Sequence, residues 1–491
     1  MNNLSSIQFY LPELVLIVSL LCVIIVDLIP RFKKLKFTIA YVGIALSAVL
    51  LYTSQGSSVS IFMNLLVVDP FSHFFKWIFL LATFSIILVS QFSHEVDKEN
   101  HVEYLSLILI VLVGLFLMSS SINLLMIYLA IELVSIPSYI LAGMKENDRS
   151  SNEASLKYVI FGSFASGLML FGLSWLYGIA GSTNIMDVHN ALLTSGNHLL
   201  IYISLFFILV GFGYKISMVP FHYWTPDVYE GSPTPVTAFF AIGPKAAGFA
   251  ILIRFLYSIY TNDASISASK LIFEINWMLV FAVISALTMT IGNFLALHQD
   301  NVKRLLAYSS ISHVGFMLIG FVAIGKEPLS AILFYLVVYL FMTLSAFYFA
   351  VIIKNNKGND NIDSWKGFAF TNPLSAAFMV ISLVSLAGLP PTAGFVGKFY
   401  LLAILFRSEV FYWLAIVAIL NSVVSLYYYF KIVKSMYFVE DDELSDDSKY
   451  VPNQYIKWTA VIFSAQTILF YFYWTPIINF INSSLVFWNS Y

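Results

Sequence analysis

Runs of about 20 mostly apolar residues recur along the whole chain and dominate what it can fold into. About 20 such residues cross the hydrocarbon core of a bilayer as a helix. Only 11% of the 491 residues are charged, whereas a soluble globular protein carries roughly 25%. The chain therefore has too little charge to cover a surface in water, and the sequence predicts an all-α polytopic membrane protein.

Fourteen runs approach the length of a membrane crossing, so we expect about 14 transmembrane helices. They cover residues 9–29, 37–54, 70–91, 102–119, 122–142, 156–178, 198–219, 233–259, 272–296, 303–324, 328–353, 374–407, 410–434 and 457–483. No basic residue precedes the first run and a basic cluster follows it, so we expect a retained helix and not a cleaved signal peptide.

The basic residues between the runs predict the direction of each helix, because cytoplasmic loops carry an excess of Lys and Arg. If both termini lie outside, sixteen basic residues fall on the inner side and four on the outer side. The inner set is Arg31, Lys33, Lys34, Lys36, Lys98, Lys145, Arg149, Lys303, Arg304, Lys354, Lys357, Lys366, Lys431, Lys434, Lys449 and Lys457. The outer set is Arg254, Lys270, Lys326 and Arg407. We therefore expect both termini outside.

Five basic residues remain inside or at the edge of the predicted helices: Lys76, Lys157, Lys215, Lys245 and Lys398. An ionisable group at bilayer depth costs at least about 2.5 to 3.5 kcal/mol, so each one needs a partner, a water-filled cavity or a function. The structural alternatives are a fixed ion pair, or a lysine whose amine reaches the membrane surface. Glu132 is the acid that lies well inside a helix other than the first.

Prolines and glycines lie close to three of these lysines. Lys215 precedes Pro220, Lys245 follows Pro244, and Lys398 follows GLPPTAG (388–394). A proline removes a backbone donor and loosens a helix, so free carbonyls and water are expected beside the amines. Burial disfavours a charged amine and a nearby carboxylate favours it, so the protonation of such sites can be switched. The pattern predicts protons, or a small cation that competes with them, as the cargo.

Two further residues bear on the chemistry. His313 lies about ten residues into its predicted helix beside three serines, where it can give and take protons, although a hydrogen-bonded core histidine explains it equally well. Cys22 is the single cysteine, which excludes a disulfide framework and a Cys-ligated iron–sulfur cluster. No basic tract indicates nucleic acid, and we expect no metal site.

The breaks near Pro220 and Pro390 indicate an internal repeat, because paired interrupted helices in two halves point to a transport path. Their helices are the seventh and the twelfth, and an offset of five turns the second copy upside down. We expect two inverted five-helix repeats. The predicted parts are 1–101 (helices 1–3), 102–262 (helices 4–8), 263–436 (helices 9–13) and 437–491 (an acidic cytoplasmic loop and helix 14).

Three long stretches carry a resemblance to a known family. They are KISMVPFHYWTPDVYEGSPTPVTAFF (215–240), DNVKRLLAYSSISHVGFMLIG (300–320) and GLPPTAGFVGKFYLL (388–402). Together they resemble the signature stretches of the antiporter-like subunits of respiratory complex I, over helices 4 to 13.

The resemblance implies roles for six residues in proton translocation. Glu132 resembles a helix 5 glutamate that pairs with a helix 7 lysine, here Lys215. Lys245 resembles the central helix 8 lysine, His313 the helix 10 linker and Lys398 the helix 12 lysine near the exit. Lys157 matches a lysine on helix 6.

The same resemblance implies a setting for the chain. Quinone reduction elsewhere in the complex drives the protonation changes, in a bacterial inner membrane. NADH, flavin, iron–sulfur and quinone sites belong to other subunits, and this chain holds no cofactor. Its expected partners are the other membrane and peripheral subunits, including neighbouring antiporter-like chains, and the lipid bilayer.

Rival functions are open at this point. A subunit of a multisubunit sodium/proton antiporter or a membrane-bound hydrogenase shares the fold and the buried lysines. A structural subunit with fixed ion pairs is a second rival. A free-standing carrier for an organic solute is disfavoured, because helix interiors lack clustered Asn, Gln and Arg. We expect the acidic run 440–449 and the segment 181–197 to be loops without chemistry.

Overall fold

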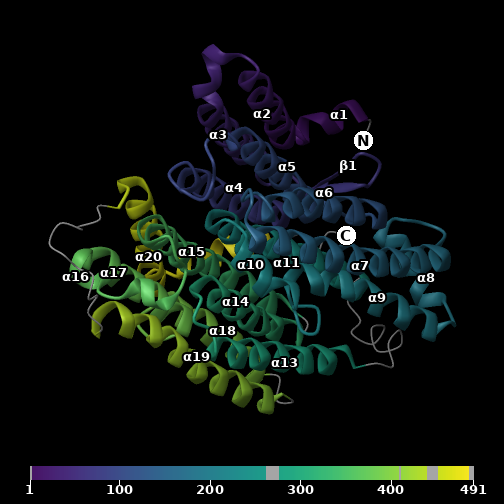
Figure 1. Cartoon of the computed structure of the whole chain (residues 1–491). Coiled ribbons are helices and arrows are strands. Elements are labelled where there is room, and N and C mark those ends of the chain that lie inside the picture. Colours follow the sequence, from purple (N-terminus) through teal and green to yellow (C-terminus); the bar gives the residue numbers. More distant parts are fainter. Residues whose placement is uncertain (1–2, 261–275, 324, 408–410, 439–451, 486–491) are drawn as a thin grey trace.

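The computed structural model describes residues 3–260, 276–323, 325–407, 411–438 and 452–485 (Figure 1). The acidic run 440–449, Lys270 and the expected boundary at 262–263 fall outside these ranges. The chain forms a bundle of helices in which the N-terminal helices lie at one edge and α13 (Trp277–Leu297) and α19 (Tyr412–Phe438) lie at the opposite edge (Figure 1).

The elements follow the predicted apolar runs. The first part contains α1 (Asn3–Phe9), α2 (Leu11–Asp27), η1 (Pro30–Leu35), α3 (Lys36–Thr53), β1 (Val59–Ile61), β2 (Leu66–Val68) and α4 (Pro70–Ser90). The second contains α5 (His101–Ser120), α6 (Leu124–Ala142), α7 (Arg149–Ala180), α8 (Ile185–Thr194), α9 (His198–Ile216), α10 (Trp224–Gly231) and α11 (Thr234–Tyr260). Besides α13 and α19, the third contains α14 (Val302–Leu318), η2 (Ile319–Phe321), α15 (Lys326–Lys357), η3 (Ile362–Trp365), α16 (Phe368–Thr371), α17 (Pro373–Ala387) and α18 (Ala393–Arg407). The last part contains α20 (Gln454–Phe472) and α21 (Thr475–Ser484).

Over the described residues, eleven helices are long and apolar enough to cross a membrane, or twelve if α20 and α21 count as one span. The all-α polytopic fold is therefore confirmed, whereas the number of 14 crossings is not. The physical reason lies in interrupted segments: α2 has 17 residues, and α17 and α18 have 15 each, fewer than the about 20 that cross a hydrocarbon core alone.

Three buried helices form the centre of the bundle. α11 packs against α4, α5, α9 and α15, and α14 packs against α10, α13 and α15. All three of α11, α14 and α15 are apolar and almost wholly buried. A helix that is apolar all round must be surrounded by other helices, so any charge on these three helices lies inside protein.

The predicted break in the seventh helix lies between α9 and α10. Ser217 has a left-handed φ of 66°, and the amide of Met218 bonds the carbonyl of Gly213, which ends α9. Pro220 then prevents continuation, because it has no N–H to donate. The chain resumes as α10, which leaves Lys215 in the last turn of α9 beside the gap.

The predicted break in the twelfth helix lies between α17 and α18. Gly388 adopts a left-handed φ of 81° after α17, and the two prolines at 390 and 391 stop the helix. A Cβ at Gly388 would lie 2.6 Å from Cδ of Lys398, so the glycine also makes room for the lysine. The break therefore positions Lys398 against the end of α17.

Other elements differ from the expected loops and spans. The segment 181–197 contains the short helix α8, which begins at a capping Asn184. The expected span 457–483 is two helices bent by 89°, because the chain is not helical at Tyr473 and Trp474 and Pro476 begins a new turn. β1 and β2 form an antiparallel hairpin that pairs Val59 with Val68.

Candidate functional site

Lys215 is fully buried and donates from Nζ to Oγ of Ser135 on α6 at 3.0 Å. Glu132 lies three residues before Ser135 on the same helix face. Within the described residues Glu132 makes no ion pair with Lys215, and its Oε1 is buried without a hydrogen-bond partner. Ser135, one turn from Glu132, therefore takes the hydrogen bond of Lys215, and the direct pair of Glu132 with Lys215 that the family resemblance implies is absent among the described contacts.

Lys245 lies in the middle of α11, where Pro244 precedes it. Its amine donates to Oγ of Ser310 on α14 at 2.6 Å and lies 5.3 Å from the ring centre of Tyr229 on α10. A Cβ added at Gly248, one turn further along α11, would lie 3.5 Å from Cγ of Lys215. The side chain of Lys215 therefore contacts α11 within one turn of Lys245.

His313 lies one turn after Ser310 on α14 and is fully buried. Its Nδ1 lies 2.7 Å from the hydroxyl of Tyr335 on α15, and its Nε2 lies 3.2 Å from the hydroxyl of Tyr429 on α19. Tyr429 also bonds Ser309. The histidine thus has a hydroxyl on each ring nitrogen, and neutral imidazole can accept from one and donate to the other.

Lys398 lies in the second turn of α18 and is held by backbone and hydroxyl oxygens. Its amine donates to the carbonyl of Ala387 at 2.9 Å and to Oγ of Ser422 at 3.2 Å. It also lies 4.5 Å from the ring centre of Phe316, one turn after His313 on α14. The structure therefore brings Lys245, His313 and Lys398 around one helix, α14.

Lys157 stands apart from this line. Its side chain is 36% exposed and pairs with Glu153 one turn away on α7, at 2.7 Å, and with Asp227 on α10. Arg304 on α14 pairs with the same Asp227 at 2.7 Å and with Glu230 at 2.7 Å. Lys157 therefore belongs to an ion-pair network that holds α10 from the outside.

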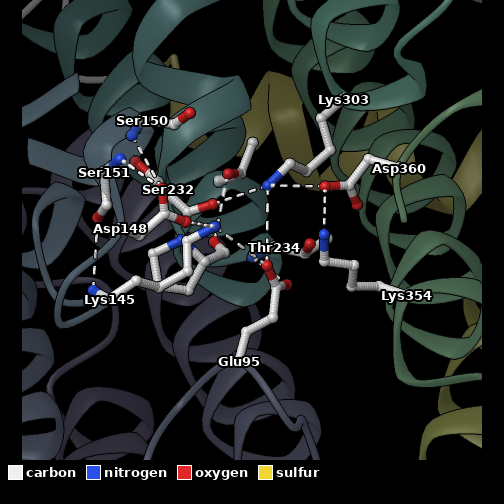
Figure 2. Close-up of polar contacts among 12 residues, drawn as sticks. Glu95, Lys145, Asp148, Ser150, Ser151, Ser232, Thr234, Lys303, Lys354 and Asp360 are labelled. Carbon is white, nitrogen blue, oxygen red and sulfur yellow. Dashed lines mark hydrogen bonds and ion pairs between the residues drawn. The ribbon is translucent and has the colours of Figure 1, made fainter. Parts of the chain in front are cut away.

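A second charged cluster was not predicted, and Figure 2 shows it. Lys303, at the start of α14, has a fully buried side chain that reaches between Glu95 and Asp360, at 3.9 and 3.6 Å. Lys145 pairs with Glu95 at 3.3 Å, and Lys354 pairs with Asp360 at 2.8 Å. The sequence assigns these three lysines to the inner side of the membrane and predicts no partner for them, whereas the structure pairs each one with Glu95 or Asp360. Glu95, Lys145 and Asp360 lie in loops on one side of the bundle, and we predict that this side faces the cytoplasm.

Glu95 also caps α11, because it accepts the backbone N–H of Thr234 at 2.8 Å. Burial alone raises the pKa of Glu95, but the charges of Lys303 and Lys145 and the bonds from Thr234 outweigh it and lower the pKa to about 2. Glu95 is therefore ionised throughout the physiological range and acts as a fixed negative charge.

Two buried ion pairs lie elsewhere. Arg254, which the sequence assigned to the outer side of the membrane, is buried in α11 and binds Asp69 bidentately at 2.8 and 3.0 Å. Lys76 on α4 binds Glu13 on α2 at 2.7 Å. No sequence signal linked Asp69 to Arg254, since 185 residues separate them.

The described residues contain no group of three or more His, Cys, Asp or Glu that could hold a metal ion. Whether the chain binds a cofactor is a separate matter, and the expectation that it binds none stays a prediction.

Lys215, Lys245 and Lys398 form a row of buried lysines, called the lysine line below. This line and the interrupted helices define an antiporter-like membrane protein. The family described as NADH:quinone oxidoreductase/Mrp antiporter, TM, matches residues 121–425. The chain belongs to this family.

Known relatives agree over nearly the full length. The chain is 41% identical to a protein of Chloroherpeton thalassium named NADH-quinone oxidoreductase subunit N 2, over 95% of this chain and 92% of the relative. It is similar to a chain of respiratory complex I from Thermus thermophilus with bound Aureothin, at 27% identity and a TM-score of 0.78, over 95% of this chain and 98% of that one. A chain of the Mrp complex from Dietzia sp. shares the fold, at 21% identity and a TM-score of 0.82, over 99% and 98%.

Proposed function

We propose that this chain is the N-type subunit of a bacterial NADH–quinone oxidoreductase and translocates protons across the membrane. Family membership and the full-length likeness to a relative named subunit N support this. The motif TPDVYEG (225–231) also resembles the N-type chains, whereas the L-type and M-type chains and the multisubunit sodium/proton antiporters have an LPDA-type motif there. Lys398 also favours the N type over the M type, because M-type chains of the family usually have a glutamate at this position of helix 12.

One observation carries the proposal: three fully buried lysines are held by uncharged partners. Within the described residues, none of Lys215, Lys245 and Lys398 lies within 4.0 Å of a carboxylate. A buried ammonium that is hydrogen-bonded to a carboxylate is held in its charged state, whereas one that is hydrogen-bonded to neutral groups can lose its proton without leaving an unpaired anion in contact with it. The serine hydroxyls on Lys215 and Lys245 can accept from the ammonium and donate to the neutral amine.

The positions of these residues suggest the order in which they pass a proton. Lys215 and Lys245 exchange protons across the face of α11 at Gly248. His313, with tyrosine hydroxyls on both nitrogens, passes the proton along α14 to Lys398. The charge of Glu132 acts on Lys215 across Ser135 and favours its protonated form. Lys157 lies in the ion-pair network of α10, and we propose that it keeps this half-helix in place.

The wider setting is part of the same proposal. Both termini lie on the outer side of a bacterial inner membrane. The neighbours are other membrane and peripheral subunits of the complex, and NADH, flavin, iron–sulfur clusters and quinone belong to those neighbours. The two five-helix units, 102–262 and 263–436, form inverted halves that each carry part of the path.

The test is Lys245→Ala in the assembled complex, with NADH-driven proton pumping measured in membrane vesicles. We expect pumping to fall by about a hundredfold or more, since a positioned proton-transfer group typically contributes 10²–10⁴-fold. Lys434→Ala, at an exposed lysine of α19, is the matched control and leaves pumping unchanged. Full pumping by an assembled Lys245→Ala complex would falsify the proposal.

Two rivals are distinguished by what accompanies the chain. Copurification from native membranes yields peripheral NADH-oxidising subunits if the proposal holds, and none if the chain belongs to a sodium/proton antiporter. A purely structural subunit predicts that lysine replacements lower the amount of assembled complex and leave pumping per complex intact.

A further inference from the structure

The cluster around Lys303 joins segments from the first three of the four predicted parts of the chain. Glu95 lies between α4 and α5, Lys145 between α6 and α7, and Asp360 after α15 (Figure 2). Lys303 has its shortest hydrogen bond to a neutral group, the carbonyl of Ser232 at 2.8 Å, which follows α10. It is therefore the central cation of the cluster and the one placed farthest from the carboxylates.

The charges of the largely buried members of this cluster do not balance. Three lysines, Lys145, Lys303 and Lys354, share two largely buried carboxylates, Glu95 and Asp360. A third carboxylate, Asp148, has a side chain that is 38% exposed and pairs at the edge of the cluster with Lys145 alone among the described residues, at 3.5 Å. Each carboxylate has its own closer lysine, at 3.3 and 2.8 Å. If Lys303 gives up its proton, two balanced ion pairs remain. Since an excess buried charge is costly, Lys303 is the group whose protonation can change most cheaply.

Two helix faces lead from this cluster to Lys245. On α14, Ser310 lies seven residues after Lys303, which is two turns and about 10 Å along the same face. Ser310 accepts the hydrogen bond from Lys245. On α11, Thr234 bonds Glu95 and lies three turns, about 16 Å, before Lys245. Buried Thr237, one turn after Thr234, donates to the carbonyl of Tyr229, whose ring lies beside the amine of Lys245.

The cluster also lies beside a cleft on the predicted cytoplasmic side. The cleft has a volume of about 870 Å³, and it is lined by the neighbours of Glu95, Lys145 and Lys354 in the sequence: His94, Val96, Glu146 and Asn355. Its walls are polar and wide enough for many waters. Lys303 thus pairs with a residue, Glu95, whose two sequence neighbours line the cleft, while its helix leads to the centre of the bundle.

We propose that the cluster of Glu95, Lys303 and Asp360 is the cytoplasmic proton-intake site, with Lys303 as the group that exchanges the proton. The ammonium of Lys303 releases a proton inward toward Lys245, and the neutral amine then takes a proton from a hydronium ion in the cleft. Glu95 and Asp360 stay ionised, and Lys145 and Lys354 stay as their fixed partners. The inference rests on the proposed function, because it supplies protons to the same lysine line.

Lys303→Arg is the primary test, because arginine keeps the positive charge and its contacts but does not deprotonate in proteins. The complex is assembled in inside-out vesicles, and proton uptake per NADH is measured. We expect the variant to assemble and to lose at least about tenfold in pumping rate. Lys76→Arg is the matched control, at a buried lysine paired with Glu13 outside the path, and keeps pumping at the wild-type level.

Glu95→Gln is the second variant, and it remains informative if Lys303→Arg does not assemble. Removing this anion favours the neutral amine of Lys303, which faces Asp360, Lys145 and Lys354 as its other charged neighbours. We expect the alkaline limb of the pumping pH profile to move to lower pH by about one unit. A merely structural Glu95 changes the amount of complex and not this limb.

The outcomes separate the two proposals. Full pumping by Lys303→Arg, or an unmoved alkaline limb in Glu95→Gln, overturns the intake site while a pumping defect in Lys245→Ala still supports the lysine line. Full pumping by Lys245→Ala overturns the lysine line itself.

Discussion

Two pairs of buried cations in the described part of the chain have opposite kinds of partner. Arg254 and Lys76 each face a buried carboxylate, Asp69 or Glu13. Lys245 and Lys398 face hydroxyl, carbonyl and ring groups. A carboxylate in direct hydrogen-bond contact, as in these two pairs at 2.7 and 2.8 Å, fixes the charge of its partner, and a neutral hydrogen-bond partner leaves that charge free to change. The difference teaches that burial alone does not mark a transport residue in this fold; the chemistry of the partner does.

The largest effect is expected when the ion pair of Arg254 with Asp69 is broken by Asp69→Asn. The change leaves Arg254 buried against an amide, and breaking a buried pair in this way costs about 3–5 kcal/mol. We expect a large loss of assembled chain from the membrane and a lower Tm of the complex. The control is Glu327→Gln, which removes a carboxylate from the exposed pair with Arg407 and costs at most about 1 kcal/mol. Equal effects of the two changes would contradict the assignment of Asp69 as a buried fixed partner.

Glu95 sharpens the comparison through pH. Its folded-state pKa of about 2 lies below its ordinary value of 4.5. The carboxylate therefore stabilises the fold fully above about pH 4.5, and this contribution, on the order of 3 kcal/mol, is lost as the pH falls from 4.5 toward 2. Thermal unfolding of the purified complex should show a stability gap between wild type and Glu95→Gln that is constant near neutrality and narrows below pH 4.5. A gap that widens on acidification would contradict the fixed charge.

Ser310→Ala gives the smallest expected effect, because it removes a neutral partner. A hydrogen bond to a charged group is worth roughly 1.5 kcal/mol, which corresponds to about tenfold in rate. We expect the pumping rate to fall by up to about tenfold, with assembly unchanged. Ser312→Ala, at a buried serine whose backbone packs on Gly292 of α13, serves as the control. No change in pumping by Ser310→Ala would remove Ser310 from the path.

The lysine line could be predicted from the sequence because scarcity of charge makes it visible. Lys245 and Lys398 interrupt apolar runs beside prolines, and the interrupted helices at Pro220 and Pro390 follow from the missing backbone donors. His313 could be placed on the same helix face as Ser310 by spacing alone. These features are local, so a single stretch of sequence contains them.

The rest depends on contacts between distant segments, which no local pattern contains. Glu95 and Asp360 lie in short polar loops that read like solvated loops, although the structure packs both against Lys303. The hydrogen bond of Lys215 to Ser135 depends on how α6 and α9 pack. The number of 14 crossings is not confirmed over the described residues, because a broken helix and a bent one look continuous in hydropathy.

The central claim is that a buried lysine with neutral partners works by losing its proton. The most direct measurement is NADH-driven pumping per assembled complex in two variants, Lys245→Arg and Arg254→Lys. The first puts an arginine where the neutral partners are, and the second puts a lysine against a carboxylate. Arginine does not deprotonate, whereas the pair with Asp69 needs only a positive charge. The account predicts that Lys245→Arg assembles and does not pump, and that Arg254→Lys pumps at the wild-type rate per complex. Wild-type pumping by Lys245→Arg would contradict it.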